Sequence, residues 1–419
     1  MSQALPYSSL EELGEELEDR SLLDYMAEHT DGDVSVPYKG ESLDEEAYVQ
    51  AVMDIHFDET YGTPFWRERM DDLGFDPREE VESIEDLRML GEADEEALRE
   101  RPVEDFMPRL FARQERGSWE SYDEVKPDPA GYDMSKSSGS TGKKKIMPWR
   151  VHTSDEMIEW YNHNFEIRGL EGGNWLIAGP PGLYEEHTTE AAARTGGVPI
   201  YNGFQTRSLK PQMKDLGQAF GQPVEFLKEA VADPGKVPSA LEGMVRSRYI
   251  EKALEEDLQS ERVEVIASVP KIVERMHGMM DSEETVTDPE DIQAILASGM
   301  SVDQEFLENA GEMYPNAEVI PMYATSFTGA NFDDPESDEA EYHSLYPLVD
   351  FNVLERTGEP LEEREEVDYG ERGQVVFNHL SSGFLWPNQA ERETAVRNEP
   401  SESFESNGDG ISSLRPLDI

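Results

Sequence analysis

Short apolar runs alternate with helix-like segments between residues 153 and 326, and this alternation constrains the fold more than any other feature of the chain. Each run is followed by glycine, proline or serine, which is typical of a buried strand and its turn. The segments between the runs repeat apolar residues at helical spacing. Alternating strands and helices indicate βαβ units, so we expect an α/β fold with helices on both faces of a sheet. The predicted strands lie within 174–182, 198–203, 263–270, 291–300 and 317–326.

The residues that precede this region predict helices. Leucines recur at helical spacing across residues 8–29, where Ser9 and Glu12 form a capping-box pattern. Residues 42–62 predict a second helix, and shorter helices interrupted by glycine and proline follow it. We therefore expect a helical lead-in over residues 1–125.

The residues that follow the alternating region predict paired β-strands. Residues 346–360 and 371–380 favour strands, and a Thr-Gly pair suits the turn between them. We expect a small β subdomain and tail over residues 346–419, after an α/β core over residues 126–345. The sequence shows no internal repeat.

The chain is strongly acidic. It carries 92 Asp and Glu residues against 36 Lys and Arg residues, and the formal net charge of −56 is spread along nearly its whole length. Such self-repulsion loosens a fold in dilute buffer and is screened at about 1 M salt, where the Debye length is roughly 3 Å. We therefore favour a protein from a high-salt cytoplasm over one that is acidic for another reason. Nucleic acids and anionic membranes are disfavoured as partners, because both bind basic surfaces.

Several function classes lack support in the sequence. There is no cysteine, which excludes disulfides, thiol nucleophiles and Cys-ligated metals. The N-terminus lacks the features of a signal peptide, and no apolar run approaches the roughly 18 residues of a membrane span, so we expect a cytoplasmic protein. The histidines show no metal-ligand spacing such as H-x-x-x-H, so we expect no metal centre. The hydrolase pattern G-x-S-x-G does not occur.

Four of the twelve lysines fall within residues 135–145, SKSSGSTGKKK, beside glycines and hydroxyl side chains. Glycines let backbone N–H groups approach an anion, hydroxyls donate further hydrogen bonds, and lysine supplies positive charge. The stretch therefore predicts a phosphate-binding loop, with a flexible surface loop as the alternative. It does not fit the Walker A pattern, because Ser137 stands at the leading glycine and Lys144 stands at the required Ser or Thr.

The loop resembles the phosphate-binding loop of adenylate-forming enzymes, whose pattern is [ST]-S-G-[ST]-T-G-x-P-K. Lys144 stands where that family usually has proline. The order of the later segments, VIASVP, ILASGM, MYATSF and the hairpin that ends in FNHL, resembles phenylacetate–CoA ligases, and the resemblance covers about residues 60–385. The matching loop residues are Ser137, Ser138, Gly139, Ser140, Thr141, Gly142 and Lys145.

The resemblance implies the large N-terminal domain of adenylate-forming enzymes and its reaction. A carboxylate, here of an aromatic acid, attacks the α-phosphate of ATP and gives an acyl-adenylate and pyrophosphate, and many members pass the acyl group to coenzyme A. In that family the loop holds the β- and γ-phosphates, so Lys145 takes a catalytic role here. Ser326 takes the place of the residue that contacts the α-phosphate. The residues at the positions that contact adenine are Ser298, Gly299, Met300 and Tyr323.

Each of these roles has an alternative. Tyr323 could be a core residue, and Ser298–Gly299 an ordinary turn. His187 lies in a region that lines the acyl pocket of the family, yet it is more often a residue at the start of a helix. The aromatic residues that could shape that pocket, with core packing as the alternative, are Trp175, Tyr184 and Phe204.

The sequence departs from the family pattern at two binding positions. Phe327 replaces the glutamate that helps to bind Mg²⁺, and a phenyl ring cannot ligate a hard cation. Mg²⁺ would then be held by ATP, by water or by another carboxylate, for which Glu341 and Asp350 are candidates. The Thr-Gly-Asp motif of the ribose site is also missing, and Asp409 is our first candidate for the ribose contact, with Glu393 as the second.

No stretch matches the mobile C-terminal domain of the family, which carries a lysine that stabilises the transition state. The last lysine here is Lys271. The sequence therefore leaves three functions open: a slow adenylating enzyme, one subunit of a split ligase whose second chain supplies the missing domain, and a noncatalytic protein that binds ATP or an acyl-adenylate.

Overall fold

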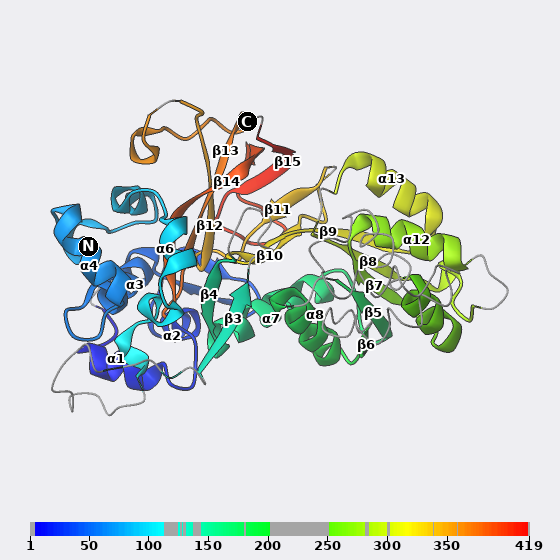
Figure 1. The fold of residues 1–419 in the computed structure, drawn as a ribbon, viewed down its shortest axis with the longest axis horizontal. Helices are drawn as coiled ribbons and strands as arrows, with labels where there is room; N and C mark the ends of the chain where they lie inside the picture. Colours follow the sequence, from blue (N-terminus) through cyan, green and yellow to red (C-terminus); the bar gives the residue numbers. More distant parts are fainter. Residues whose placement is uncertain are drawn as a thin grey trace, which may run out of the picture.

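One continuous 11-stranded sheet runs through the molecule, and helices pack on its faces (Figure 1). The computed structural model describes residues 5–112, 125, 128, 131–136, 144–179, 182–201, 251–280, 285–299, 302–337, 339–357 and 359–417. Within these residues, no helix combines the length and the apolar composition needed to cross a bilayer.

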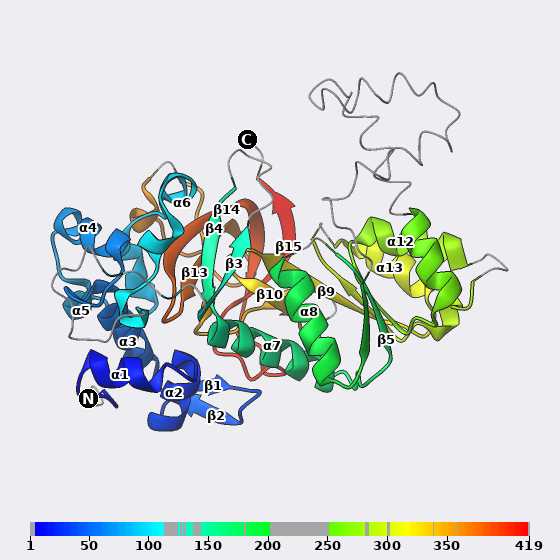
Figure 2. The same cartoon turned by 60° about the horizontal axis from the view of Figure 1, so that its bottom comes forward.

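The parallel half of the sheet confirms the α/β fold expected from the alternating pattern. Strand β5 pairs in parallel with β6 and β7, β7 with β8, and β8 with β9. Helices α7 and α8 cover one face, where Trp175 and Ile177 are buried, and α12 and α13 cover the other, where Leu176 and Ala178 are buried (Figure 2). The bounds are β5 Asn174–Ala178, β6 Val198–Tyr201, β7 Val265–Ser268, β8 Ala294–Ala297, β9 Glu318–Thr325, α7 Val151–Glu166, α8 Leu183–Arg194, α12 Pro270–Met280, α13 Gln304–Met313 and the 3₁₀ turn η8 Pro289–Asp291.

Strand β9 joins this half to an antiparallel half. Its first residues pair in parallel with β8, and its last residues pair antiparallel with β10. The order then continues as β10, β11, β15, β14, β13 and β12. Because β11 pairs with β15, the sheet runs across residue 345, the predicted limit of the core, and the domain limits stay predictions. The bounds are β10 Gly329–Asp333, β11 Glu341–His343, β12 Val349–Leu354, β13 Arg372–Leu380, β14 Leu385–Asn398, β15 Gly410–Pro416 and the 3₁₀ turn η9 Leu361–Glu363.

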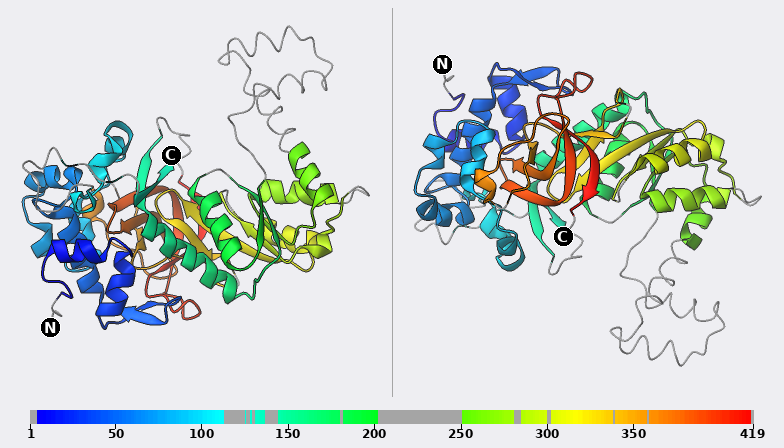
Figure 3. Two further views of the ribbon diagram at one scale, coloured as in Figure 1. Left: turned by 90° about the horizontal axis from the view of Figure 1, so that it is seen from below. Right: turned by 90° about the horizontal axis from the view of Figure 1, so that it is seen from above.

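The N-terminal helices pack at the end of the molecule opposite α12 and α13 (Figure 3). They are tied to the antiparallel half by side chains that donate to backbone carbonyls: Tyr48 Oη to Leu380 O at 2.6 Å and Trp66 Nε1 to Leu385 O at 3.1 Å. The bounds are α1 Leu10–Glu16, α2 Leu22–His29, α3 Glu45–Phe57, α4 Pro64–Leu73, α5 Pro77–Glu80, α6 Glu95–Glu100, η1 Glu85–Leu90, η2 Val103–Phe106, η3 Arg109–Phe111, and the two-stranded sheets β1 Val34–Val36 with β2 Glu41–Leu43 and β3 Tyr132–Lys136 with β4 Ile146–Arg150.

Two helices differ from the expectation, each for a local reason. The single helix expected over residues 8–29 is two helices, because Ser21 begins a new one: its side chain accepts a hydrogen bond from Asp24 N at 2.9 Å. Helix α7 begins at Val151, two residues before the position 153 at which the sequence pattern predicts the first helix of the alternating region, and it has no side-chain cap. Strand β4 runs directly into it, and the last strand residue, Arg150, is anchored by a 2.6 Å hydrogen bond from its Nη2 to Leu17 O.

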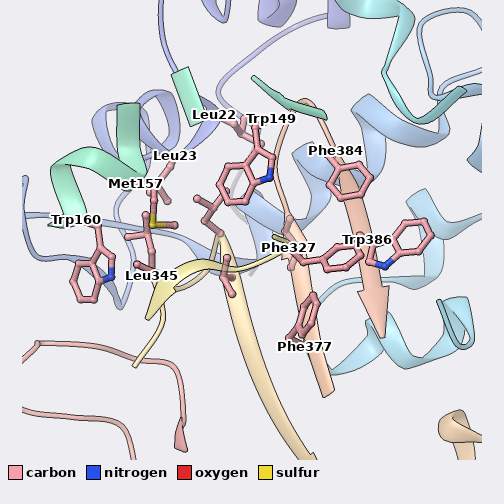
Figure 4. Close-up of a cluster of buried hydrophobic side chains, with 14 of the residues drawn as sticks. Leu22, Leu23, Trp149, Met157, Trp160, Phe327, Leu345, Phe377, Phe384 and Trp386 are labelled. Atoms are coloured by element: carbon pink, nitrogen blue, oxygen red, sulfur yellow. The ribbon is translucent and has the colours of Figure 1, made fainter. Parts of the chain in front are cut away.

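A cluster of aromatic side chains packs the turn between β9 and β10 against β13 and β14 (Figure 4). Phe327, in the turn between β9 and β10, lies 5.4 Å from Phe377 of β13 and 6.1 Å from Trp386 of β14 between ring centroids. Phe384 stacks on Trp386 at 5.7 Å. The β9–β10 turn is therefore packed as part of the core.

Candidate functional site

A cleft of 840 Å³ opens where the parallel strands β8 and β9 end, beside β11, β14 and β15. In α/β sheets, ligands bind at the carboxyl ends of the strands. The volume falls within the roughly 300–1,000 Å³ of small-molecule sites. The lining residues that bear on function are Gly299, Leu307, Tyr323, Glu391, Glu393 and Arg415.

The loop after β8 carries two of the residues assigned to the adenine. Gly299 lines the cleft with a φ of +79°, and a Cβ there would lie 3.2 Å from Val269 Cγ1, so glycine suits the position and keeps the wall open. Ser298 is buried, and its N–H donates to Ser268 O at 3.1 Å. Met300 lies outside the described residues.

Tyr323, on β9, lies in the wall of the cleft. Its ring centroid is 6.0 Å from that of Tyr342 and 6.1 Å from that of Phe351. Burial, together with the charges of Glu391 and Glu393, raises the pKa of Tyr323 well above its ordinary value, so the hydroxyl stays protonated. Tyr323 thus presents an aromatic ring to the cleft on a fixed support.

Lys145, which directly precedes β4, is a largely buried cation near this cleft. Its ammonium pairs with Glu95 at 2.7 Å and lies 4.8 Å from the ring centroid of Phe327, and its side chain is 15% exposed. It also interacts with the cleft residue Glu391. Although burial opposes ionisation of Glu95, the hydrogen bond and charge of Lys145 lower its pKa. The rest of the predicted phosphate loop, Ser137 to Gly142, lies outside the described residues.

Two carboxylates, Glu391 and Glu393, lie two residues apart on β14, and both line the cleft together with Arg392 between them. Burial raises the pKa of Glu391 to about 7, with Lys145 opposing this shift and Glu393 adding to it. Glu393 was the second candidate for the ribose contact, whereas the sequence did not single out Glu391. The two acids lie where the pairing of β14 with β13 is irregular, so strand alternation alone would not have placed both of them in the cleft.

The turn after β9 holds the position that the resemblance assigns to the α-phosphate. Ser326 is half-buried, and its carbonyl accepts a 3.2 Å hydrogen bond from Trp149 Nε1. The next residue, Phe327, is 3% exposed, and its carbonyl lies 2.7 Å from His379 Nδ1. The turn therefore points its second side chain into the core, where a metal-binding glutamate would be buried.

The other carboxylate candidates have partners elsewhere. Asp409 accepts hydrogen bonds from Arg397 Nε at 2.6 Å and Tyr369 Oη at 3.0 Å, and it precedes the end of β15 that is distant from the cleft. Asp350 is buried between two asparagine side chains, and burial raises its pKa to about 8. Glu341 lies on β11 at 2.9 Å from His343 Nε2. None of the three lines the cleft in the described part of the chain.

His187 is buried in α8, where its ring lies 6.1 Å from Trp149 and 6.2 Å from Tyr161 between centroids. Burial lowers the pKa of His187 to about 4, so the imidazole is neutral at ordinary pH. Trp175 is a core residue of β5. Tyr184 is partly buried and packs against the same hydrophobic core, and Phe204 lies outside the described residues.

Solved structures share this fold, although no family model and no curated protein matches the sequence. An open conformation of 2-hydroxyisobutyryl-CoA ligase, in complex with 2-HIB-AMP and CoA, matches with a TM-score of 0.61 and 12% identity, over 92% of this chain and 71% of that chain. The same ligase in its thioesterification state matches with a TM-score of 0.58 and 13% identity, over 89% and 67% of the two chains. The chain therefore has the fold of the N-terminal domain of adenylate-forming enzymes.

Proposed function

We propose that this protein uses ATP to activate a carboxylic acid as an acyl-adenylate, in the manner of phenylacetate–CoA ligases. The observation that carries the proposal is the cleft at the ends of β8 and β9, in a fold shared with a ligase that binds 2-HIB-AMP and CoA. An acyl-adenylate requires an aromatic face for its base, an acceptor for its ribose hydroxyls and a cation for its phosphate. Tyr323, Glu393 and the adjacent Lys145 offer these groups.

In the proposed reaction, a carboxylate oxygen of the acid attacks the α-phosphorus of ATP. A new P–O bond forms, the bond from the α-phosphorus to the bridging oxygen breaks, and pyrophosphate leaves with that oxygen. Because charge develops on the transferring phosphate, a fixed ammonium lowers the barrier. Lys145 supplies this charge when the phosphates compete with Glu95 for it, and the Ser326 hydroxyl donates to an oxygen of the α-phosphate.

Mg²⁺ accompanies ATP in such reactions, and the donor set of the cleft suits it. Mg²⁺ binds through one or two carboxylates together with phosphate oxygens. Glu391 and Glu393 repel one another across the cleft face of β14, and a cation between them would remove that repulsion. We assign Glu391, together with phosphate oxygens, the Mg²⁺-binding role that Phe327 cannot fill, while Glu393 accepts the ribose hydroxyls.

We further propose an aromatic acid as the substrate and coenzyme A as the acyl acceptor. Trp149, whose indole donates to the Ser326 carbonyl, also contacts the ring of His187, so aromatic side chains adjoin the position proposed for the α-phosphate. A planar acyl group would pack against these rings. Coenzyme A is supported by the ligase that shares the fold, which binds CoA.

A noncatalytic nucleotide-binding protein is the second candidate. It is favoured by Phe327, which occupies the metal-binding position of the resemblance with a side chain that packs in the core. Both candidates require nucleotide in the cleft, and they differ in whether pyrophosphate is released.

Exchange of labelled pyrophosphate into ATP distinguishes them. We would measure it in molar KCl with Mg²⁺ and a panel of aryl acids, for the native chain, Lys145→Ala and Lys252→Ala. Lys252 is a matched control, because its side chain is 74% exposed and, within the described residues, pairs with the exposed Glu256 four residues further on. We expect acid-dependent exchange that falls by ~10²–10³ in Lys145→Ala and is retained in Lys252→Ala. A folded protein that binds ATP without exchange would be the noncatalytic protein or a subunit that needs a second chain.

A further inference from the structure

A cluster of metal-ligating side chains lies outside the cleft, at the hairpin formed by β10 and β11. Asp334, Glu341 and His343 each offer one oxygen or nitrogen atom, and these atoms lie within 4.8 Å of one another. We propose that they bind one divalent transition-metal ion of the Zn²⁺ class. The site is independent of the proposed function.

The pairing of the hairpin places the three side chains on one face. Asp334 N donates to Glu341 O at 2.8 Å, so these two residues stand opposite one another, and His343 follows Glu341 by two positions on β11. Residues that stand opposite one another, and residues two apart on a strand, share a face of the sheet. Tyr342, between the two β11 ligands, instead lines the nucleotide cleft. The metal site and the cleft therefore lie on opposite sides of one strand.

Gly410 on the neighbouring strand β15 leaves space for the cluster. Strand β15 pairs with β11, and a Cβ at Gly410 would lie 2.5 Å from His343 Cε1 and 3.1 Å from Glu341 Oε1. Because Gly410 lies within regular strand, space rather than backbone conformation requires glycine there. The absence of a side chain at Gly410 therefore leaves room for the imidazole of His343 and the carboxylate of Glu341.

His343 is fully buried, and its hydrogen bonding is incomplete. Nε2 lies 2.9 Å from Glu341 Oε1, while Nδ1 has no partner in the described residues. Buried side-chain nitrogens are partnered in the large majority of cases, so a buried imidazole that keeps one unpartnered nitrogen while its other nitrogen contacts a carboxylate points to a ligand. Ligand atoms about 2.0–2.1 Å from a tetrahedral Zn²⁺ lie roughly 3.3 Å apart, so small side-chain movements close the site.

Asp334 is held by hydroxyl groups, as metal-ligating carboxylates usually are. Ser401 Oγ donates to its Oδ2 at 2.5 Å, and Ser403 Oγ donates to its Oδ1 at 2.6 Å. Asp334 and Glu341 also line a second cleft, of 510 Å³, which gives an ion a path of entry. Glu399 lines the same cleft without belonging to the cluster.

The ligand set selects the kind of ion. K⁺, Mg²⁺ and Ca²⁺ prefer oxygen ligands alone, whereas an imidazole nitrogen with two carboxylates suits Zn²⁺ and its neighbours in the first transition row. The spacing of the histidines predicts no metal centre, because the H-x-x-x-H pattern detects two histidines on one helix. A site made by two strand residues and their cross-strand neighbour escapes it.

The test is a titration of the full chain with Co²⁺ and with Zn²⁺ in molar KCl, where screening suppresses diffuse binding to surface acids. Co²⁺ reports ligation through its visible absorption, and calorimetry reports the stoichiometry of Zn²⁺. We expect one ion per chain, and a loss of affinity of about tenfold or more in His343→Gln and in Glu341→Gln. Glu399→Gln should bind as the native chain does.

Circular dichroism would establish that each variant is folded. If His343→Gln does not fold, Glu341→Gln decides the outcome alone, because its amide has the shape of the carboxylate. Three outcomes would overturn the proposal: no binding to the native chain, unchanged binding to Glu341→Gln, or an equal loss of binding in Glu399→Gln. Any binding that remained would then be diffuse attraction of the ion to an acidic surface.

Discussion

Single residues in the cleft respond to pH in a direction that the structure defines. Burial and Glu393 raise the pKa of Glu391 from 4.5 to about 7 against the charge of Lys145, so the native state binds a proton more tightly than the unfolded chain does. The contribution of Glu391 to the free energy of unfolding therefore falls as pH rises from about 4.5 to 7. Glu391→Gln removes this pH-dependent contribution. As pH rises from 5 to 8, the free energy of unfolding of the variant should therefore increase by roughly 1–3 kcal/mol relative to that of the native chain.

Urea denaturation at the two pH values, in constant molar KCl, measures this difference. Glu305→Gln is the matched control, because Glu305 is an exposed carboxylate on α13. The control should follow the pH dependence of the native chain. Parallel curves for Glu391→Gln and the native chain would contradict the assignment of a crowded carboxylate pair.

Phe327 is predicted to serve the core rather than a metal. It is 3% exposed and contacts Phe377 and Trp386, so Phe327→Ala removes a buried ring and should lower the free energy of unfolding by about 3–5 kcal/mol. Phe327→Leu, which keeps most of the volume, should cost less than half as much. Chemical denaturation measures both, and a loss below about 1 kcal/mol for Phe327→Ala would show that the ring is dispensable to the core.

At the scale of elements, two glycines are predicted to respond oppositely to alanine. A Cβ at Gly373 of β13 would lie 2.4 Å from the carbonyl oxygen of Leu354 on β12, and backbone cannot move aside cheaply. Gly373→Ala should therefore lower the free energy of unfolding by about 1–3 kcal/mol. Gly311, within α13, has no atom within 4 Å of the position that a Cβ would take. Gly311→Ala should therefore raise the free energy of unfolding by about 0.5–1 kcal/mol. Thermal unfolding of the two variants checks the opposite signs, and a stabilised Gly373→Ala would refute the close approach of β12 and β13.

The parallel strands could be predicted from the sequence, because their short apolar runs and flanking turns carry a local signal. Local signals failed where long-range pairing decides the structure. Strand β14 carries polar residues on its cleft side, so nothing in its own sequence marks Glu391 as a cleft residue. The break between α1 and α2 depends on Ser21, whose S-x-x-D pattern with Asp24 is a local capping signal within the leucine periodicity that predicted one helix. Asp409 follows a glycine, as in the Gly-Asp pattern expected for a ribose contact. In the structure, however, its carboxylate accepts a hydrogen bond from Arg397 on the neighbouring strand β14.

At the scale of the whole molecule, the charge of −56 predicts a strong dependence on salt. Repulsion between acidic groups is screened as the Debye length falls to roughly 3 Å at 1 M. We expect the melting temperature to rise by roughly 10 °C or more between 0.1 M and 2 M KCl. Most of the rise should occur below about 1 M, where screening is nearly complete.

Calorimetry or dichroism at several KCl concentrations measures this dependence. Sucrose, which is excluded from protein surfaces without screening charge, is the control solute and should raise the melting temperature less. A melting temperature that is independent of KCl would contradict the hypothesis of a protein from a high-salt cytoplasm.

The central claim is that the cleft between β9 and β14 binds an adenine nucleotide, and direct binding of ATP tests it most simply. Calorimetric titration in molar KCl with Mg²⁺ would compare the native chain with Tyr323→Ala and with Tyr369→Ala, a tyrosine that is 47% exposed and does not line the cleft. Stacking on an aromatic ring contributes about 1–3 kcal/mol per base, so Tyr323→Ala should weaken binding by about tenfold or more, and Tyr369→Ala should bind as the native chain does. A native chain that binds no ATP, or a Tyr323→Ala variant that binds it unchanged, would contradict the claim.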